Sequence, residues 1–182
     1  MKMLPGKRIY LRQFEMSDKE IVLRGANEPE GARLTGTRVT FTMDQIEAYI
    51  LRNQEGTDRA AWVICTHQDE IVGEVVINEI DEDNRSANIR IALYEARHFG
   101  HGYGTEALHL AIDFGFTELN LHRISLGVFD FNPRAVHVYE TLGFQHEGIS
   151  RDALLWDGEF HNEIRMSILR PEWIRLQQSR SR

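Results

Sequence analysis

The sequence predicts an α/β protein in which helices cover both faces of a mixed, mostly antiparallel central sheet. Two observations lead to this fold class. Three strand-like segments, separated only by short turn-rich connections, predict an antiparallel meander in the first half of the chain. From residue 97 onward, strand and helix patterns alternate, which predicts a β-α-β-α-β arrangement in the second half.

The length and composition are typical of one ordinary globular domain. The chain has 182 residues, of which 42% are apolar and 27% are charged. Such a chain is long enough to bury its own core. We therefore expect a single domain over residues 1–182, with a frayed tail at 177–182.

The charge balance argues against nucleic-acid and membrane partners. Lys and Arg number 21 against 28 Asp and Glu, a net charge of −7, whereas nucleic-acid binding favours a basic face. No apolar run approaches the ~18 residues of a membrane span, and Pro5 and Gly6 interrupt the start before a signal-peptide core can form. The single cysteine, Cys65, is expected to be a buried strand thiol. A cytoplasmic location is the resulting expectation.

The N-terminal segment predicts a strand, a short helix and an irregular connection. Alternating apolar residues in RIYLRQF (8–14) are typical of a half-buried strand. Ser17 with Glu20 forms the capping-box pattern that opens a helix. The proline and two glycines within residues 27–40 then predict an irregular linker.

The remaining elements follow from caps, periodicity and turn signals. Thr42 with Gln45 repeats the capping box and opens a helix over MDQIEAYILRN. Asp157 and Gly158 form a strong type I′ turn signal, which predicts a C-terminal hairpin. Strands are further expected at 60–66, 70–78, 86–94 and 124–129, and helices at about 104–117 and 133–142.

The most informative segment is the glycine-rich stretch RHFGHGYGTEALHLAIDFGF at residues 97–116. Gly100, Gly102 and Gly104 precede a predicted helix, where glycines let the backbone approach a ligand and the first helical turn offers free N–H groups to a phosphate. A flexible turn without a ligand is the alternative. A dinucleotide fingerprint would need glycine where Thr105 stands, and the Gly-Lys-Ser/Thr of a nucleotide P-loop is absent.

A second motif, FNPRAVHVYETLGF, follows at residues 131–144. Asn132 is a helix cap and Pro133 suits the first helical position. Apolar residues then recur at helical spacing. Taken alone, Tyr139 is either a core aromatic whose hydroxyl finds a partner or a catalytic acid.

Both motifs, in this order, resemble those of the GNAT superfamily of acetyl-CoA-dependent N-acetyltransferases, and imply the GNAT fold. The resemblance covers nearly the whole chain, from RIYLRQF through GEVVI and both motifs to RDALLWDGEF. That last block looks like the subgroup of ribosomal-protein N-terminal acetyltransferases and spermidine acetyltransferases. With the family signature registered on Gly102 and Gly104, the chain departs from it at Phe99, where Gln or Arg is common. A register shifted to Arg97, Gly100 and Gly102 is the alternative.

The resemblance implies which residues hold acetyl-CoA. The pyrophosphate would rest on residues 99–104, mainly through backbone N–H groups. The end of the strand at 86–94 would separate from the strand at 124–129 and pair with the pantetheine arm. The expected cofactor contacts are Leu93, Tyr94, Phe99, Gly100, His101, Gly102, Tyr103, Gly104, Thr105 and Asn132.

The resemblance also implies the catalytic groups. Tyr139 would donate a proton to the CoA thiolate, since a phenol of pKa ~10 is reasonably matched to a thiol near ~8.5. Glu74 is the leading candidate to deprotonate the acceptor amine, with a solvated glutamate as the alternative reading. His122 and His137 could also accept a proton near neutral pH, with a structural role as the alternative for each.

The sequence thus predicts acetyl transfer from acetyl-CoA to a primary amine by direct attack, without a covalent intermediate. The acceptor is a protein N-terminus, a polyamine or another small-molecule amine. The acidic residues Glu28, Glu30 and Asp44 would attract it, with ordinary surface solvation as an equal alternative. No metal is expected, because His98 and His101 lack further ligands at suitable spacing. A homodimer is a further expectation. The rival functions are a CoA-responsive regulatory module and, more distantly, a nicotinamide-dependent oxidoreductase.

Overall fold

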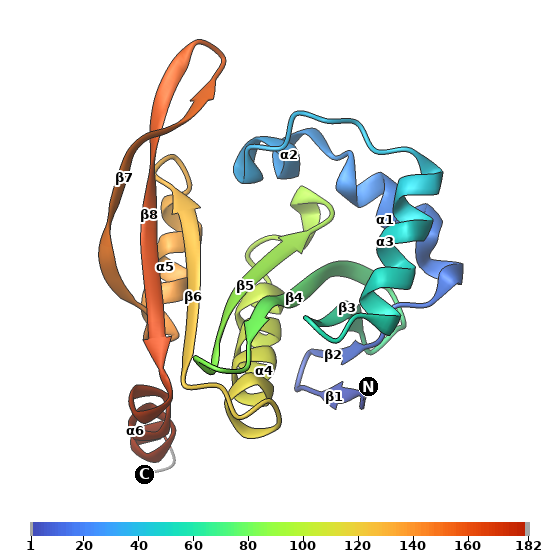
Figure 1. The fold of residues 1–182 in the computed structure, drawn as a ribbon. Coiled ribbons are helices and arrows are strands. Elements are labelled where there is room, and N and C mark those ends of the chain that lie inside the picture. The colour runs from blue at the N-terminus through green and yellow to red at the C-terminus, as the bar shows by residue number, and fades with distance from the viewer. Residues whose placement is uncertain (1, 181–182) are drawn as a thin grey trace.

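The computed structural model describes residues 2–180, which form one eight-stranded sheet flanked by helices (Figure 1). The strands are β1 Leu4–Pro5, β2 Ile9–Arg12, β3 Ala60–Thr66, β4 Ile71–Asp81, β5 Ser86–Leu93, β6 Arg123–Phe129, β7 Gln145–Trp156 and β8 Glu159–Leu169. The helices are α1 Lys19–Ala26, α2 Pro29–Thr35, α3 Met43–Glu55, α4 Tyr103–Thr117, α5 Pro133–Thr141 and α6 Arg170–Arg180, with 3-10 turns η1 Met16–Asp18 and η2 Ala96–His98.

The strands lie in the order β1-β2-β3-β4-β5-β6-β8-β7. Neighbouring strands are antiparallel except β5 and β6, which are parallel. The expected meander is β3-β4-β5, in which Glu74 pairs with Val63 on one side and with Ala92 on the other. The mixed, mostly antiparallel sheet is therefore confirmed.

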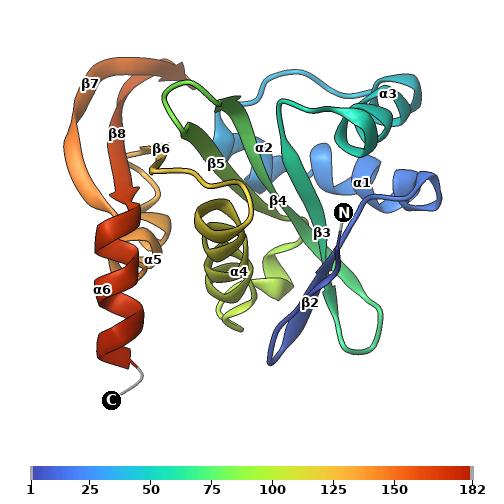
Figure 2. The same cartoon turned by 60° about the horizontal axis from the view of Figure 1, so that its bottom comes forward.

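Helices cover both faces of this sheet, as expected (Figure 2). Because side chains alternate along a strand, β3 and β4 supply side chains to both cores. Trp62 of β3 lies in the core that contains Leu108 of α4. The next residue, Val63, lies in the opposite core with Ile50 of α3. Cys65 is buried in this second core, so its predicted place is confirmed.

The first helical segment begins differently from the prediction. Glu15 and Asp18 form the capping box around η1, in place of Ser17 and Glu20. Asp18 is buried, and its carboxylate accepts from the Glu15 backbone N–H at 2.8 Å and from the Arg12 guanidinium at 2.7 and 2.8 Å. The bidentate pair with Arg12 fixes Asp18 at this position, because such pairs are strong and directional.

The segment 27–40, predicted to be irregular, contains the seven-residue helix α2. Pro29 occupies its first turn, the Glu28 side chain accepts from the Gly31 N–H at 2.6 Å, and Gly36 ends it in a left-handed conformation with φ +66°. The proline and glycine that suggested an irregular linker are therefore the start and stop signals of a short helix.

Two further predictions from the sequence, a helix cap and a turn, are confirmed, and the predicted frayed tail is wrong in part. The capping box that opens α3 is present, and Asp157 and Gly158 have the positive φ values, 48° and 83°, of a type I′ turn. The frayed tail is wrong for residues 177–180, which continue α6, while 181–182 lie outside the described residues. Trp173, 2% exposed, packs this helix onto the core. Within residues 2–180, no helix combines the length and apolar character that crossing a bilayer requires.

Candidate active site

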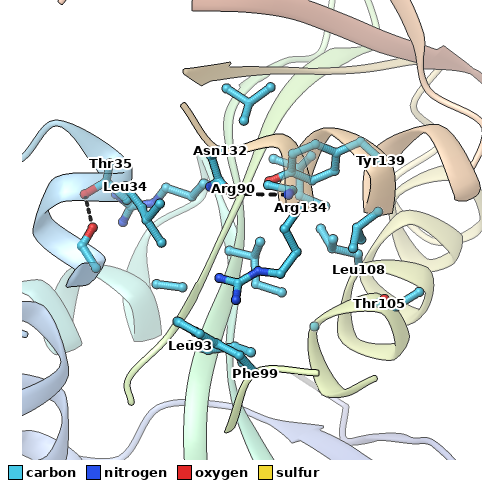
Figure 3. Close-up of a pocket in the computed structure, with 18 of the residues that line it drawn as sticks. Leu34, Thr35, Arg90, Leu93, Phe99, Thr105, Leu108, Asn132, Arg134 and Tyr139 are labelled. Carbon is cyan, nitrogen blue, oxygen red and sulfur yellow. Dashed lines mark hydrogen bonds between the residues drawn. The ribbon is translucent and has the colours of Figure 1, made fainter. Parts of the chain in front are cut away.

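A cavity lies where β5 and β6 separate. The two strands pair only at their beginnings, from Ser86 opposite Arg123 to Asn88 opposite Ser125, although both continue well beyond. The backbone N–H and C=O groups beyond that point have no partner across the split and remain available to a ligand. A cavity of about 620 Å³ occupies the split, within the size range of small-molecule sites (Figure 3). The separation of these strands, expected from the resemblance, is confirmed.

The glycine loop delivers the N-terminus of α4 to this cavity. Gly100 and Gly102 have φ values of +78° and +80°, which L side chains rarely adopt. Tyr103 then begins the helix, and the first intrahelical bond runs from the Glu106 N–H to the Gly102 carbonyl at 3.0 Å. The N–H groups before Glu106 have no intrahelical acceptor. Together with the positive end of the helix dipole, they form a site suited to a phosphate.

Most of the expected cofactor contacts line the cavity, and two do not. Tyr94 is 3% exposed and its hydroxyl donates to Glu74 at 2.8 Å. His101 is exposed, bonds the Arg97 carbonyl and stacks on the Tyr103 ring. The expected residues that line the cavity are Leu93, Phe99, Gly100, Gly102, Tyr103, Gly104, Thr105 and Asn132. Their contact with CoA stays a prediction.

Arg134 supplies a cation that the sequence reasoning missed. Its guanidinium carbon lies 4.0 Å from the centroid of the Phe99 ring, a cation–π contact at the edge of the glycine loop (Figure 3). Position 99 is where the family commonly has Gln or Arg. Here an apolar ring at that position holds a cation that comes from α5. Arg134 directly follows the Asn132-Pro133 cap, but nothing in the sequence brings that position to the glycine loop.

Tyr139 lies in the cavity wall with its hydroxyl unpaired. Its side chain is 8% exposed, and among the described residues none hydrogen-bonds its hydroxyl. Burial raises the pKa of Tyr139 to about 12, so the phenol is fully protonated at neutral pH. Asn132 lies nearby and caps α5 by accepting from the Ala135 N–H at 3.2 Å (Figure 3). A protonated phenol without a protein acceptor is free to donate to a ligand.

Glu74 lies on the opposite face of β4 from α4 and does not line the cavity. Its two carboxylate oxygens accept from the hydroxyls of Tyr49 at 2.7 Å and Tyr94 at 2.8 Å. Arg90 donates to the Tyr49 hydroxyl at 2.8 Å and lies 4.0 Å from Glu74. Burial, foremost, and the charge of Glu74 hold the pKa of both tyrosines well above the usual range. Glu74 therefore anchors Arg90, and its role as a base stays a prediction.

We call the part of the cavity lined by α2 and β8 the acceptor end, because we expect the amine to enter there. It draws on elements far apart in the chain. Leu34 and Thr35 of α2 and Arg90 of β5 line it, as Figure 3 shows. Gly127 of β6 and Glu163 of β8 line it too, and sequence reasoning singled out neither. A glycine inside the strand pattern ISLGVF was the available signal, because interior strand glycines often mark a close approach.

The other predicted proton acceptors and acidic residues do not line this cavity. His122 and His137 are exposed and do not line it. Glu28 caps α2, Glu30 is in an ion pair within the same helix, and Asp44 is exposed on α3. Across residues 2–180, no group of three or more His, Cys, Asp or Glu side chains is placed to hold a metal ion.

The open strand edges suit the amide-rich arm of coenzyme A, and the N-terminus of α4 suits its pyrophosphate. The fold and the cavity together define an acyl-CoA-dependent transferase. The chain belongs to the GNAT acetyltransferase family, since the family model described as an acetyltransferase (GNAT) domain matches residues 8–145.

Individual relatives extend this likeness over nearly the full chain. An uncharacterized N-acetyltransferase, p20, from Bacillus licheniformis is 30% identical over 95% of this chain and 99% of its own length. A spermidine N(1)-acetyltransferase from Vibrio cholerae is 32% identical over 73% of this chain and 76% of its own. The solved structure of the Vibrio cholerae spermidine N-acetyltransferase with CoA and spermine has a TM-score of 0.86 and 28% identity, covering 93% of this chain and 99% of that one.

The predicted family, fold and reaction are thereby confirmed. The protein is an N-acetyltransferase that uses acetyl-CoA as its co-substrate and acts on an amine. The rival functions, a regulatory module and a nicotinamide-dependent oxidoreductase, receive no support from these likenesses.

Proposed function

We propose that the enzyme acetylates a primary amine of a small polycationic molecule of the polyamine class. The observation that carries the reaction is the buried, protonated Tyr139 hydroxyl, which lies unpaired in the wall of the split between β5 and β6. The acceptor class is supported by relatives named for spermidine and by the spermine complex of a structural neighbour. The net charge of −7 also favours a cationic substrate.

In this mechanism the thioester of acetyl-CoA lies in the split, with its phosphates on the glycine loop. Free N–H groups along β5 polarise the thioester carbonyl and stabilise the negative charge that develops on its oxygen. The neutral amine attacks the carbonyl carbon, the C–S bond breaks, and Tyr139 gives its proton to the departing thiolate. Asn132 orients the cofactor beside Tyr139.

Glu74 enters the proposal as a positioning residue that holds Arg90 through Tyr49, and the role of base predicted from the sequence is the alternative to be tested. Glu74 does not line the cavity, and each of its carboxylate oxygens already accepts from a tyrosine hydroxyl, Tyr49 or Tyr94. This placement disfavours a direct contact with an amine in the cavity. A Glu74→Gln variant removes the base, whereas its amide oxygen still accepts from one of the two tyrosines. A loss of kcat that recovers at high pH would indicate a base, and a rise in the KM for the acceptor at constant kcat would indicate positioning.

The test is acetyl-CoA-dependent release of free thiol in the presence of spermidine, an aminoglycoside or a basic N-terminal peptide, in separate assays. We expect release with spermidine, and a fall in kcat of about a hundredfold or more in Tyr139→Phe, with the KM for acetyl-CoA kept. Tyr10→Phe is the matched control, since Tyr10 bonds Asp69 away from the cavity. An unchanged rate in Tyr139→Phe would remove Tyr139 from the role, and release with the peptide alone would replace the polyamine class.

A homodimer in the cytoplasm is part of the same proposal. The edge strand β7 and its partner β8 expose Ile149, Leu155 and Phe160, with exposed fractions of 62%, 43% and 63%. Unpaired strand edges with apolar side chains favour association with a second chain. Analytical ultracentrifugation tests this: a dimer that Ile149→Glu converts to a monomer supports it, and a wild-type monomer at micromolar concentration overturns it.

A further inference from the structure

A glycine in the interior of β6 leaves room for a carboxylate from β8. Gly127 has no positive φ, so the backbone does not itself require glycine there. A Cβ on residue 127 would clash with Oε1 of Glu163. Glycine in a strand interior costs about 0.5–1 kcal/mol relative to alanine and often marks a close approach. The Glu163 carboxylate therefore occupies the space that a side chain at position 127 would fill.

Both residues face the side of the sheet away from α4. Leu126 and Val128 are buried in the core that contains α4, so Gly127 between them faces the other way. Glu163 pairs with Phe129 in the antiparallel ladder and therefore shares the face of Phe129 and Gly127. Helix α2 lines the same cavity. The carboxylate is thus placed at the acceptor end, near the strand edge where the thioester would lie.

Glu163 is the one carboxylate that lines the cavity among the residues the structure describes. Its Oε2 accepts from Arg165 at 3.2 Å, but that guanidinium is 57% exposed, and surface pairs of this kind contribute little. Arg90 is already held by Tyr49. The other charged or titratable side chains that line the cavity are Arg90, His98, Tyr103, Arg134 and Tyr139. Glu163 is therefore available to a cation that enters the cavity.

We infer that Glu163 binds the ammonium group of the acceptor and receives its first proton, an inference that rests on the proposed function. One N–H bond of the ammonium breaks and its proton passes to the Glu163 carboxylate. The neutral nitrogen then attacks the thioester carbon, and the C–S bond breaks as Tyr139 protonates the thiolate. The second proton of the nitrogen replaces the one that Tyr139 gave up, and Glu163 releases its proton to water. One proton is released per acetyl group transferred.

The test compares three variants with the wild type, with spermidine as the acceptor. Glu163→Gln removes the charge, whereas Gly127→Ala keeps it but displaces the carboxylate, which is the movable end of a flexible side chain. Glu159→Gln is the matched control, because Glu159 is exposed on the same strand and does not line the cavity. Melting temperatures of all variants establish that they fold.

At pH 7 we expect Glu163→Gln to lower kcat/KM for spermidine at least a hundredfold and Gly127→Ala about tenfold. Glu159→Gln should stay within twofold, and the KM for acetyl-CoA should change less than twofold in all three. The deficit of Glu163→Gln should shrink toward pH 10, since an amine of pKa ~10 is then partly neutral already. A purely structural role would not produce that recovery.

A Glu163→Gln rate within threefold of the wild type, or a deficit of equal size at pH 7 and pH 10, would overturn the role of Glu163. The failure of the proposed function is distinct: wild-type enzyme would then release no thiol with spermidine. In that case the same three variants are compared on whichever amine of the acceptor panel the wild type acetylates, with the same expected ratios.

Discussion

The two ends of the cavity are built in different ways. At the cofactor end, one contiguous stretch, residues 99–105, supplies a loop and the first turn of α4. At the acceptor end, α2, β5, β6 and β8 each contribute a few side chains. Phosphate binding therefore depends mainly on backbone conformation, with one added side-chain cation from Arg134. Acceptor binding depends on side chains that only the tertiary structure brings together. A substitution at one end should change the affinity or KM for one substrate and leave the affinity or KM for the other unchanged.

The largest of these effects is expected from Arg134→Ala at the cofactor end. We expect Arg134 to donate a charge-assisted hydrogen bond to a phosphate of acetyl-CoA. Loss of such a bond costs ~1.5–2 kcal/mol, which corresponds to about tenfold to thirtyfold in affinity. We expect acetyl-CoA binding, measured by calorimetry, to weaken by that factor while the KM for the acceptor is kept. Arg134→Lys keeps the charge but loses the planar stack on Phe99, and should show an intermediate affinity. Equal losses for both substrates would break the distinction between the two ends.

The cofactor end could be predicted because its signals are local in the sequence. Gly100 and Gly102 lie directly before the helix that begins at Tyr103, so the sequence pattern alone places them together. The position of Arg134 over Phe99 could not be predicted in this way. That contact requires α5 to lie beside the loop, which the order of the strands decides.

The acceptor end was missed for the same reason. Gly127 and Glu163 meet only because β6 pairs with β8. Glu74 was predicted correctly on its strand, but the tyrosines that engage its carboxylate come from α3 and from the end of β5. At the N-terminus, the predicted capping box of Ser17 and Glu20 overlaps the observed one of Glu15 and Asp18. The ion pair between Arg12 and Asp18 holds Asp18 in the observed one.

The glycine loop itself provides a second, smaller test of the cofactor end. Gly102 has a φ of +80°, whereas Gly104 lies within α4 with only ordinary contacts around a Cβ. Gly102→Ala should therefore lower the free energy of unfolding by about 1–2 kcal/mol, because a left-handed residue with a Cβ is strained. Gly104→Ala should leave it unchanged or raise it slightly. Urea unfolding without ligand measures both. Equal stability of the two variants would mean that the loop changes its conformation freely.

At the acceptor end, Tyr49→Phe should lower the free energy of unfolding by less than Gly102→Ala does. Its hydroxyl donates to Glu74 at 2.7 Å and accepts from Arg90 at 2.8 Å. Its loss should lower the free energy of unfolding by about 0.5–1.5 kcal/mol. Arg90 then loses its anchor in the cavity wall, so the KM for the acceptor should rise a few-fold while acetyl-CoA affinity is kept. Tyr10→Phe, remote from the cavity, is the matched control for activity. A loss of acetyl-CoA affinity in Tyr49→Phe would contradict the separation of the two ends.

The smallest expected effect concerns the pH dependence of kcat. We expect kcat to stay constant over a pH range in which a tyrosine with the ordinary pKa would lower it. With a pKa of 10, Tyr139 would be half deprotonated at pH 10 and kcat would fall about fourfold by pH 10.5. Burial raises its pKa to about 12, so the protonated donor persists throughout that range. The raised pKa favours the protonated phenol. Activity that depends on this proton is therefore at its full level well below pH 12, and it is lost only as the pH rises through the pKa of Tyr139. We therefore expect kcat at saturating substrates to be constant from pH 8.5 to 10.5. A fall centred near pH 10 would mean that water reaches the phenol, and that the junction between the two ends of the cavity is open to solvent.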